Sequence, residues 1–207
     1  MISDMLAQIR IVPVLVLNSV DEGLRMCDAL VSNGLPAAEI TFRTAAAEEV
    51  IRAASQRFPD MVIGAGTVLN TSDLHRAADA GARFAVAPGF NPTVVHEALS
   101  SKFDFIPGVL TPGEIEQGLE LGLRTFKFFP AEAAGGAAML KALIAPYRHL
   151  GVRFMPTGGV KPANVEDYLA IPEVAAVGGT WLNGADAATI RAAAELAREY
   201  RERNHVG

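Results

Sequence analysis

Short runs of β-forming residues alternate with alanine-rich helical stretches along this whole chain, and this alternation constrains the fold more than any other feature. We expect eight strands, at residues 12–17, 38–42, 62–66, 84–87, 103–106, 125–129, 152–155 and 175–177. Eight strand–helix units in series predict a closed parallel (β/α)8 barrel. The alternative is an open doubly wound sheet. It usually carries a glycine-rich phosphate turn after the first strand, and the sequence LNSVD at residues 17–21 is not such a turn.

The chain shows no internal boundary, since no linker rich in proline, glycine or serine divides it. We therefore predict one domain over residues 1–207, near the lower size limit for a barrel. The sequence TPGE at residues 111–114 predicts a helix start with a capping box and proline at the first helical position. Asn91 and Pro92 predict a second start of this kind, and residues 186–203 predict an amphipathic closing helix.

Composition limits the possible classes of protein. Half of the residues are hydrophobic, a fifth are charged and the net charge is −5, which indicates a globular chain without a basic surface for nucleic acid. No apolar segment approaches the roughly 20 residues of a membrane-spanning helix. The first residues lack signal-peptide features and Cys27 is the single cysteine, so we expect a cytoplasmic protein without disulfides. The four histidines have no metal-ligand spacing, so no tightly held metal is expected.

One lysine, Lys127, lies in an otherwise apolar run with the sequence TFKFFP at residues 125–130. Burial of an ammonium group is costly, so such surroundings favour the neutral amine, the form that attacks a carbonyl carbon. Side chains alternate along a strand, so Lys127 is expected on the face opposite Phe126 and Phe128, pointing into the barrel. The alternative is that the flexible stem of the lysine carries its ammonium group to solvent.

The second strand ends in another charged pattern, EITFRT at residues 39–44. A period of two places Glu39 and Arg43 on one face and the apolar Ile40 and Phe42 on the other. The apolar pair would pack against helices, which leaves the carboxylate and the guanidinium group pointing into the barrel. An internal ion pair without a catalytic role is the alternative for these two residues.

Glycines and hydroxyl residues cluster after several other strands. Glycines at strand ends let a substrate approach the backbone closely, although each glycine alone can simply form a turn. Gly-Gly pairs beside threonines, in the sequences PTGG at residues 156–159 and GGTW at 178–181, follow the last two strands. In barrels the loops after strands seven and eight often bind phosphate through backbone N–H groups, so a phosphorylated ligand is predicted.

Four motifs together resemble those of one enzyme family. They are EITFRT from Glu39, GAGTVLN from Gly64, FKFFPAE from Phe126 and PTGG from Pro156. In this order and spacing, from about residue 11 to 181, they are similar to the 2-keto-3-deoxy-6-phosphogluconate (KDPG) aldolases. That family includes enzymes that also split 2-keto-4-hydroxyglutarate (KHG).

The resemblance implies roles for particular residues. Lys127 would form the Schiff base, and Glu39 would be the general acid and base. Arg43 and Thr67 would hold the pyruvyl carboxylate, with Pro88 lining the same pocket. Thr157 would lie near the sugar hydroxyls, and the phosphate end would contain Gly158, Gly159, Gly178, Gly179 and Thr180. Many relatives carry serine in place of Thr180, and because the hydroxyl is kept we expect phosphate binding to be kept.

The resemblance also implies the reaction, which is the reversible cleavage of KDPG to pyruvate and glyceraldehyde 3-phosphate, with KHG cleavage as a second activity. A covalent imine on Lys127 would replace a metal, so no cofactor is expected. The partners would be a small phosphorylated keto acid and further copies of the chain, a trimer in many relatives, and neither nucleic acid nor membrane. Two rival functions are a sugar-phosphate isomerase or epimerase that needs no imine, and a non-catalytic phospho-sugar-binding protein.

Overall fold

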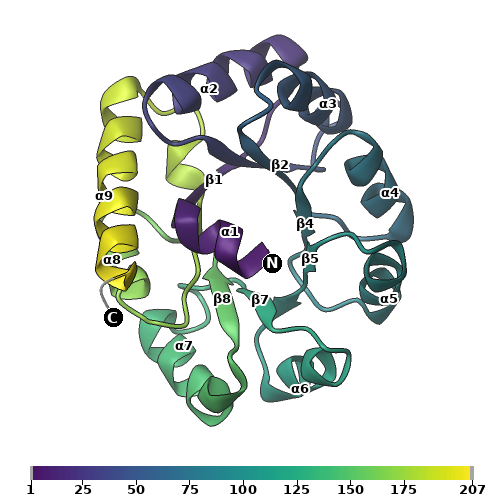
Figure 1. The fold of residues 1–207 in the computed structure, drawn as a ribbon, viewed down its shortest axis with the longest axis vertical. Coiled ribbons are helices and arrows are strands. Elements are labelled where there is room, and N and C mark those ends of the chain that lie inside the picture. Colours follow the sequence, from purple (N-terminus) through teal and green to yellow (C-terminus); the bar gives the residue numbers. More distant parts are fainter. Residues whose placement is uncertain (1, 206–207) are drawn as a thin grey trace.

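The computed structural model describes residues 2–205. Short parallel strands surround a central axis, and helices form a ring outside them (Figure 1). The strands are β1 Ile11–Leu15, β2 Ala37–Thr41, β3 Val62–Gly66, β4 Phe84–Val86, β5 Phe105–Ile106, β6 Gly108–Val109, β7 Thr125–Phe128, β8 Arg153–Pro156 and β9 Val177–Gly179. The α-helices are α1 Ile2–Ile9, α2 Val20–Ser32, α3 Ala47–Arg57, α4 Thr71–Asp79, α5 Pro92–Ser101, α6 Pro112–Glu120, α7 Gly136–Ile144, α8 Val165–Leu169 and α9 Ala187–His205, with 3-10 turns η1 Ala145–Leu150 and η2 Thr180–Leu182.

The strands close into a barrel. Six of them pair in the order β5-β4-β3-β2-β1-β9, and three in the order β6-β7-β8. At one seam β5 and β6 are separated only by Pro107, which lacks an N–H group, so they form one interrupted strand. At the other seam, a parallel bridge joins Phe154 of β8 to Val174, which precedes β9, and another joins Thr157, which follows β8, to Gly178 of β9. The predicted (β/α)8 barrel is therefore confirmed.

The strand at residues 62–66 has the expected bounds, the others differ by one to three residues at one or both ends, and two of these differences concern the path of the barrel strands. The fifth was expected at residues 103–106 but continues after Pro107 to Val109. The last was expected at residues 175–177 but spans Val177–Gly179, so Gly178 and Gly179 lie in the strand rather than in the loop after it. Glycine has a low strand propensity, which hides this strand in the sequence. Pairing with Val12 and Pro13 of β1 overrides that propensity.

The two faces of the strands pack in different ways. Outward-facing residues such as Ile40, Phe126 and Phe128 belong to the large core between barrel and helices. The barrel interior contains a smaller cluster with Phe84 and Met155, against which Ile2 and Leu6 of α1 also pack, and α1 lies across the barrel axis (Figure 1). None of the sequence patterns described above predicts this helix. Among the described residues, no helix is both long and apolar enough to span a membrane.

The predicted helix starts are confirmed. Thr111 caps α6, where its hydroxyl accepts from Glu114 N and the Glu114 carboxylate accepts from Thr111 N at 2.9 Å. Asn91 caps α5, with Oδ1 accepting from Thr93 N at 3.1 Å. The expected closing helix is α9.

Candidate active site

Glu39 and Lys127 meet inside the barrel. Glu39 lies in the middle of β2 and Lys127 in β7, and the Lys127 ammonium donates to the Glu39 carboxylate at 3.0 Å and 3.3 Å. Lys127 is 4% and Glu39 1% exposed. The inward direction expected for both side chains is confirmed, and burial excludes a lysine stem that carries its charge to solvent. Each charge is compensated by the other, as burial of an ion requires.

Neighbouring residues leave space for the Glu39 carboxylate and contact the Lys127 ammonium group. A Cβ atom on Gly66 would lie 2.3 Å from Glu39 Oε1, so the absence of a side chain at this position of β3 makes room for the carboxylate. The ring centroid of Phe129 lies 5.8 Å from Lys127 Nζ, at a distance where the ring face attracts a cation. Proton transfer from the ammonium to the carboxylate over 3.0 Å would give a neutral amine next to a protonated acid.

The structure corrects the expectation for Arg43. Strand β2 ends at Thr41, so the period of two does not extend to Arg43, which lies in the following turn and is exposed. Within the described part of the chain its side chain forms no hydrogen bond or ion pair, so it is not the partner of Glu39. It still lies at the carboxyl end of β2, on the edge of the barrel where substrates bind in this fold.

Other expected residues gather at the same edge. Thr67 follows β3 and has a left-handed backbone (φ 57°), and Pro88 follows β4. Thr157 is buried after β8 and pairs with Gly178 of β9. A Cβ on Gly178 would lie 2.4 Å from Thr157 Oγ1, so Thr157 is in direct contact with β9.

The loop after β8 has an unusual backbone. Gly158 and Gly159 have φ values of 101° and 79°, a region that L side chains rarely adopt. Gly179 ends β9 beside this loop, and Thr180 is exposed at the start of η2. The two Gly-Gly sequences therefore lie at one end of the barrel, as the sequence predicts for a phosphate site.

Comparison with known proteins bears on this arrangement. The sequence model of the family described as "KDPG and KHG aldolase" matches residues 2–198 of this chain. The chain belongs to this family.

Individual KDPG aldolases agree with that assignment. The 2-dehydro-3-deoxy-phosphogluconate aldolase of Haemophilus influenzae is 47% identical over 180 residues, which cover 87% of this chain and 84% of that one. The KDPG aldolase of Zymomonas mobilis, solved with 3-phosphoglycerate, superimposes with a TM-score of 0.86 at 39% identity and 94% coverage of both chains. The Legionella pneumophila enzyme, solved with pyruvate captured at low pH as a covalent carbinolamine intermediate, has a TM-score of 0.86 at 37% identity and covers 96% of this chain and 97% of that one.

Sequence reasoning gave no role to two residues beside the expected phosphate site. Tyr168 of α8 is fully buried and donates its hydroxyl to Glu132, which follows β7. Glu132 stands in the FKFFPAE motif, but nothing in the sequence connects it with a tyrosine 36 residues away. This pair lies beside the loop after β8, because Glu132 N donates to Gly158 O at 3.0 Å.

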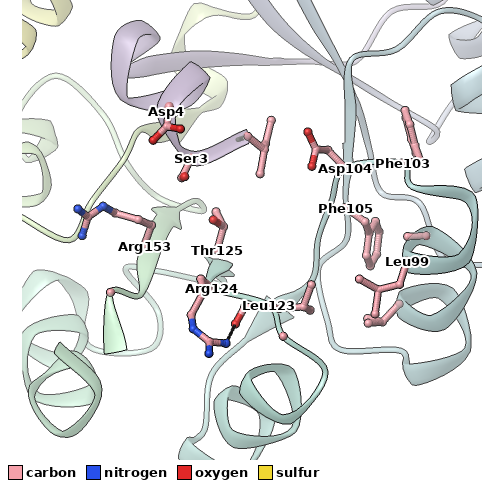
Figure 2. Close-up of a pocket in the computed structure, with 15 residues that line it drawn as sticks. Ser3, Asp4, Leu99, Phe103, Asp104, Phe105, Leu123, Arg124, Thr125 and Arg153 are labelled. Atoms are coloured by element: carbon pink, nitrogen blue, oxygen red, sulfur yellow. Dashed lines mark hydrogen bonds between the residues drawn. The ribbon is translucent and has the colours of Figure 1, made fainter. Parts of the chain in front are cut away.

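A cavity of about 370 Å³ lies at the opposite end of the barrel (Figure 2). Thr125 and Arg153, the first residues of β7 and β8, line it together with Ser3 of α1. The expected site residues do not line this cavity. It is therefore distinct from the candidate site at the carboxyl ends of the strands, where substrates bind in this fold. Among the described residues, no three histidine, cysteine, aspartate or glutamate side chains are grouped to hold a metal ion.

Proposed function

We propose that this chain is a class I aldolase that reversibly cleaves KDPG to pyruvate and glyceraldehyde 3-phosphate. The observation that carries this proposal is the buried pair of Lys127 and Glu39, 3.0 Å apart inside a barrel of the KDPG and KHG aldolase family. A nucleophilic amine and a carboxylate that can exchange its proton are the two groups that imine chemistry needs.

The first stage forms the imine. Lys127 passes a proton to Glu39, and the neutral amine attacks the C2 ketone of the substrate to give a carbinolamine. Glu39 returns a proton to the C2 hydroxyl, which leaves as water. The product is an iminium ion on Lys127, an electron sink in the position where other aldolases use a metal ion. We therefore expect no metal or cofactor requirement, with unchanged activity after treatment with EDTA.

The second stage breaks the carbon chain. Glu39 takes the proton of the C4 hydroxyl, the C3–C4 bonding electrons move into the iminium ion, and glyceraldehyde 3-phosphate leaves. Glu39 then delivers its proton to C3 of the enamine. Water hydrolyses the resulting pyruvyl imine, which releases pyruvate and restores the amine of Lys127.

The remaining site residues bind the two ends of the substrate. Arg43 offers an exposed guanidinium group, unpaired among the described residues, whose planar fork suits the pyruvyl carboxylate, with Thr67 and Pro88 on the same rim. Thr157 lies near the hydroxyl groups of the sugar chain and contacts them. The phosphoryl group is bound by backbone N–H groups of the phosphate end and by the Thr180 hydroxyl. The phosphate end contains Gly158, Gly159, Gly178 and Gly179.

KHG is a second substrate under this proposal. It has the same keto acid end but carries a carboxylate in place of the phosphorylated tail, so it uses Lys127, Glu39 and Arg43 without filling the phosphate end. The family description, which names both aldolases, supports this dual activity.

The family resemblance and the single cysteine bear on the oligomeric state and the cellular compartment. We propose a homotrimer, because KDPG aldolases are commonly trimeric. We propose a cytoplasmic location, because Cys27 is a buried free thiol that suits a reducing compartment. Light scattering of the purified chain would test the trimer. A mass of one or two chains of 21.9 kDa would contradict it.

The test of the proposed function is borohydride reduction in the presence of pyruvate, followed by peptide mass mapping. We expect a pyruvyl adduct on Lys127 and none on Lys141, an exposed lysine of α7 that serves as internal control. No adduct in folded protein would overturn the aldolase and favour an isomerase or epimerase. KDPG cleavage that persists in Lys127→Ala would exclude the imine route.

A further inference from the structure

The loop 157–160, which carries Gly158 and Gly159 at the proposed phosphate end, is held from one side by the chain after β7. Ala131 N donates to Thr157 O at 2.8 Å, and Glu132 N donates to Gly158 O at 3.0 Å. Residues 131 and 132 thus run alongside this loop and fix its carbonyl groups. The orientation of the loop N–H groups, on which phosphate binding depends, is set by the same contacts.

The side chain of Glu132 reaches the same loop. A Cβ on Gly159 would lie 2.6 Å from Glu132 Cβ and 2.7 Å from Glu132 Cγ, so the stem of the glutamate occupies the space over this glycine. The Glu132 residue is exposed, and a free glutamate of this kind would sample several rotamers. Some of these would bring its negative charge toward a phosphate on the neighbouring loop.

Tyr168 fixes one rotamer of Glu132. Its hydroxyl donates to Glu132 Oε1, and its ring is fully buried in the core beneath α8. Burial, and then the hydrogen bond and charge of Glu132, raise the pKa of Tyr168, so the hydroxyl keeps its proton at every ordinary assay pH. The donor is therefore rigid and always available.

We infer that Tyr168 is a positioning residue for phosphorylated substrates. It holds the Glu132 carboxylate in one place and the Glu132 stem against Gly159, and so keeps loop 157–160 in its phosphate-binding shape. Tyr168 does not contact the reacting atoms, and it acts through Glu132. This inference rests on the proposed function, since it concerns the phosphate end of the same site. Tyr168 should therefore affect the KM of substrates that carry a phosphate, and should not affect imine formation at Lys127.

Three tyrosines provide a matched test, because each donates its hydroxyl to a glutamate. The bond of interest joins Tyr168 to Glu132, while Tyr147 donates to Glu116 at 2.9 Å and Tyr200 to Glu166 at 3.0 Å. Glu166 lies in α8, the helix that carries Tyr168, so Tyr200→Phe removes a similar bond from the same helix without touching loop 157–160. Tyr147→Phe and Tyr200→Phe are therefore the controls.

In Tyr168→Phe we expect the KM for KDPG to rise about tenfold, as for loss of a hydrogen bond to a charged group. The KM for KHG and the rate of pyruvate trapping on Lys127 should stay within about twofold of wild type, because neither uses a phosphate site. Both control variants should keep all three values. A KM for KDPG that does not change, or one that rises equally for KHG, would overturn the inference.

A second variant keeps the test decisive if Tyr168→Phe does not fold. Glu132 is exposed, so Glu132→Ala should fold normally, and we expect it to raise the KM for KDPG without changing pyruvate trapping. In the double variant the two effects should not add, since both remove one contact. A lower KM for KDPG in Glu132→Ala would overturn the inference. Absence of pyruvate trapping in wild type would instead overturn the proposed function.

Discussion

The Glu39 carboxylate and the Lys127 ammonium group are separated by 88 residues in the sequence and by 3.0 Å in the barrel. Glu39→Gln keeps the shape of the side chain but removes the proton acceptor. We expect kcat for KDPG cleavage to fall about 10²- to 10⁴-fold, the usual contribution of a general acid or base. Steady-state kinetics would measure this, and a kcat within threefold of wild type would remove Glu39 from the role.

The same pair predicts an effect on stability. Lys127→Met leaves the buried Glu39 carboxylate without a partner and should lower the free energy of unfolding by about 3 kcal/mol. The double variant Lys127→Met, Glu39→Leu replaces both charges and should return to within about 1 kcal/mol of wild type. Urea denaturation at pH 7 would test both values. Equal stability of the single and double variants would mean that the charges do not interact.

Gly66 offers a test of the space around Glu39. A Cβ at this position would lie 2.3 Å from Glu39 Oε1, so Gly66→Ala should displace the carboxylate and lower kcat by about tenfold or more. Gly113, in α6, is the matched control, because a Cβ there meets nothing within 4 Å. Gly113→Ala should leave kcat unchanged. A fully active Gly66→Ala enzyme would contradict the role of this glycine.

The capping box of α6 predicts a dependence of stability on pH. Burial alone would raise the pKa of Glu114, but hydrogen bonds from Leu110 N and from the hydroxyl and N–H of Thr111 outweigh it and hold the pKa below its ordinary value of 4.5. The folded state thus binds this proton less tightly than the unfolded state. The stabilisation is present above pH 4.5 and is lost as the pH falls through the depressed pKa.

Glu114→Gln removes that titration. We expect the variant to be about 1 kcal/mol less stable than wild type at pH 7, and the difference to shrink as the pH falls below the depressed pKa. Urea titrations across this range would measure it. A difference that is constant with pH would show that the carboxylate charge contributes nothing to the cap.

Much of the barrel follows from local sequence. The alternation of strand and helix patterns, the helix starts at Thr111 and Asn91 and the inward faces of Glu39 and Lys127 depend only on neighbouring residues, and the structure has them as predicted. Local reasoning is weaker at element ends. The alternation of β2 predicts an inward-facing Arg43, but the strand ends at Thr41, and the sequence places Gly178 and Gly179 after a strand that in fact contains them.

The amino-acid sequence by itself thus determined the fold class, the family and the residue types of the site, because periodicity and motifs are properties of consecutive residues. Only the tertiary structure decided which residues meet. The ion pair of Lys127 with Glu39, the space left by Gly66 and the bond from Tyr168 to Glu132 all join separate elements. Such contacts depend on how the strands align and how the barrel closes, and these are set by packing of the whole core.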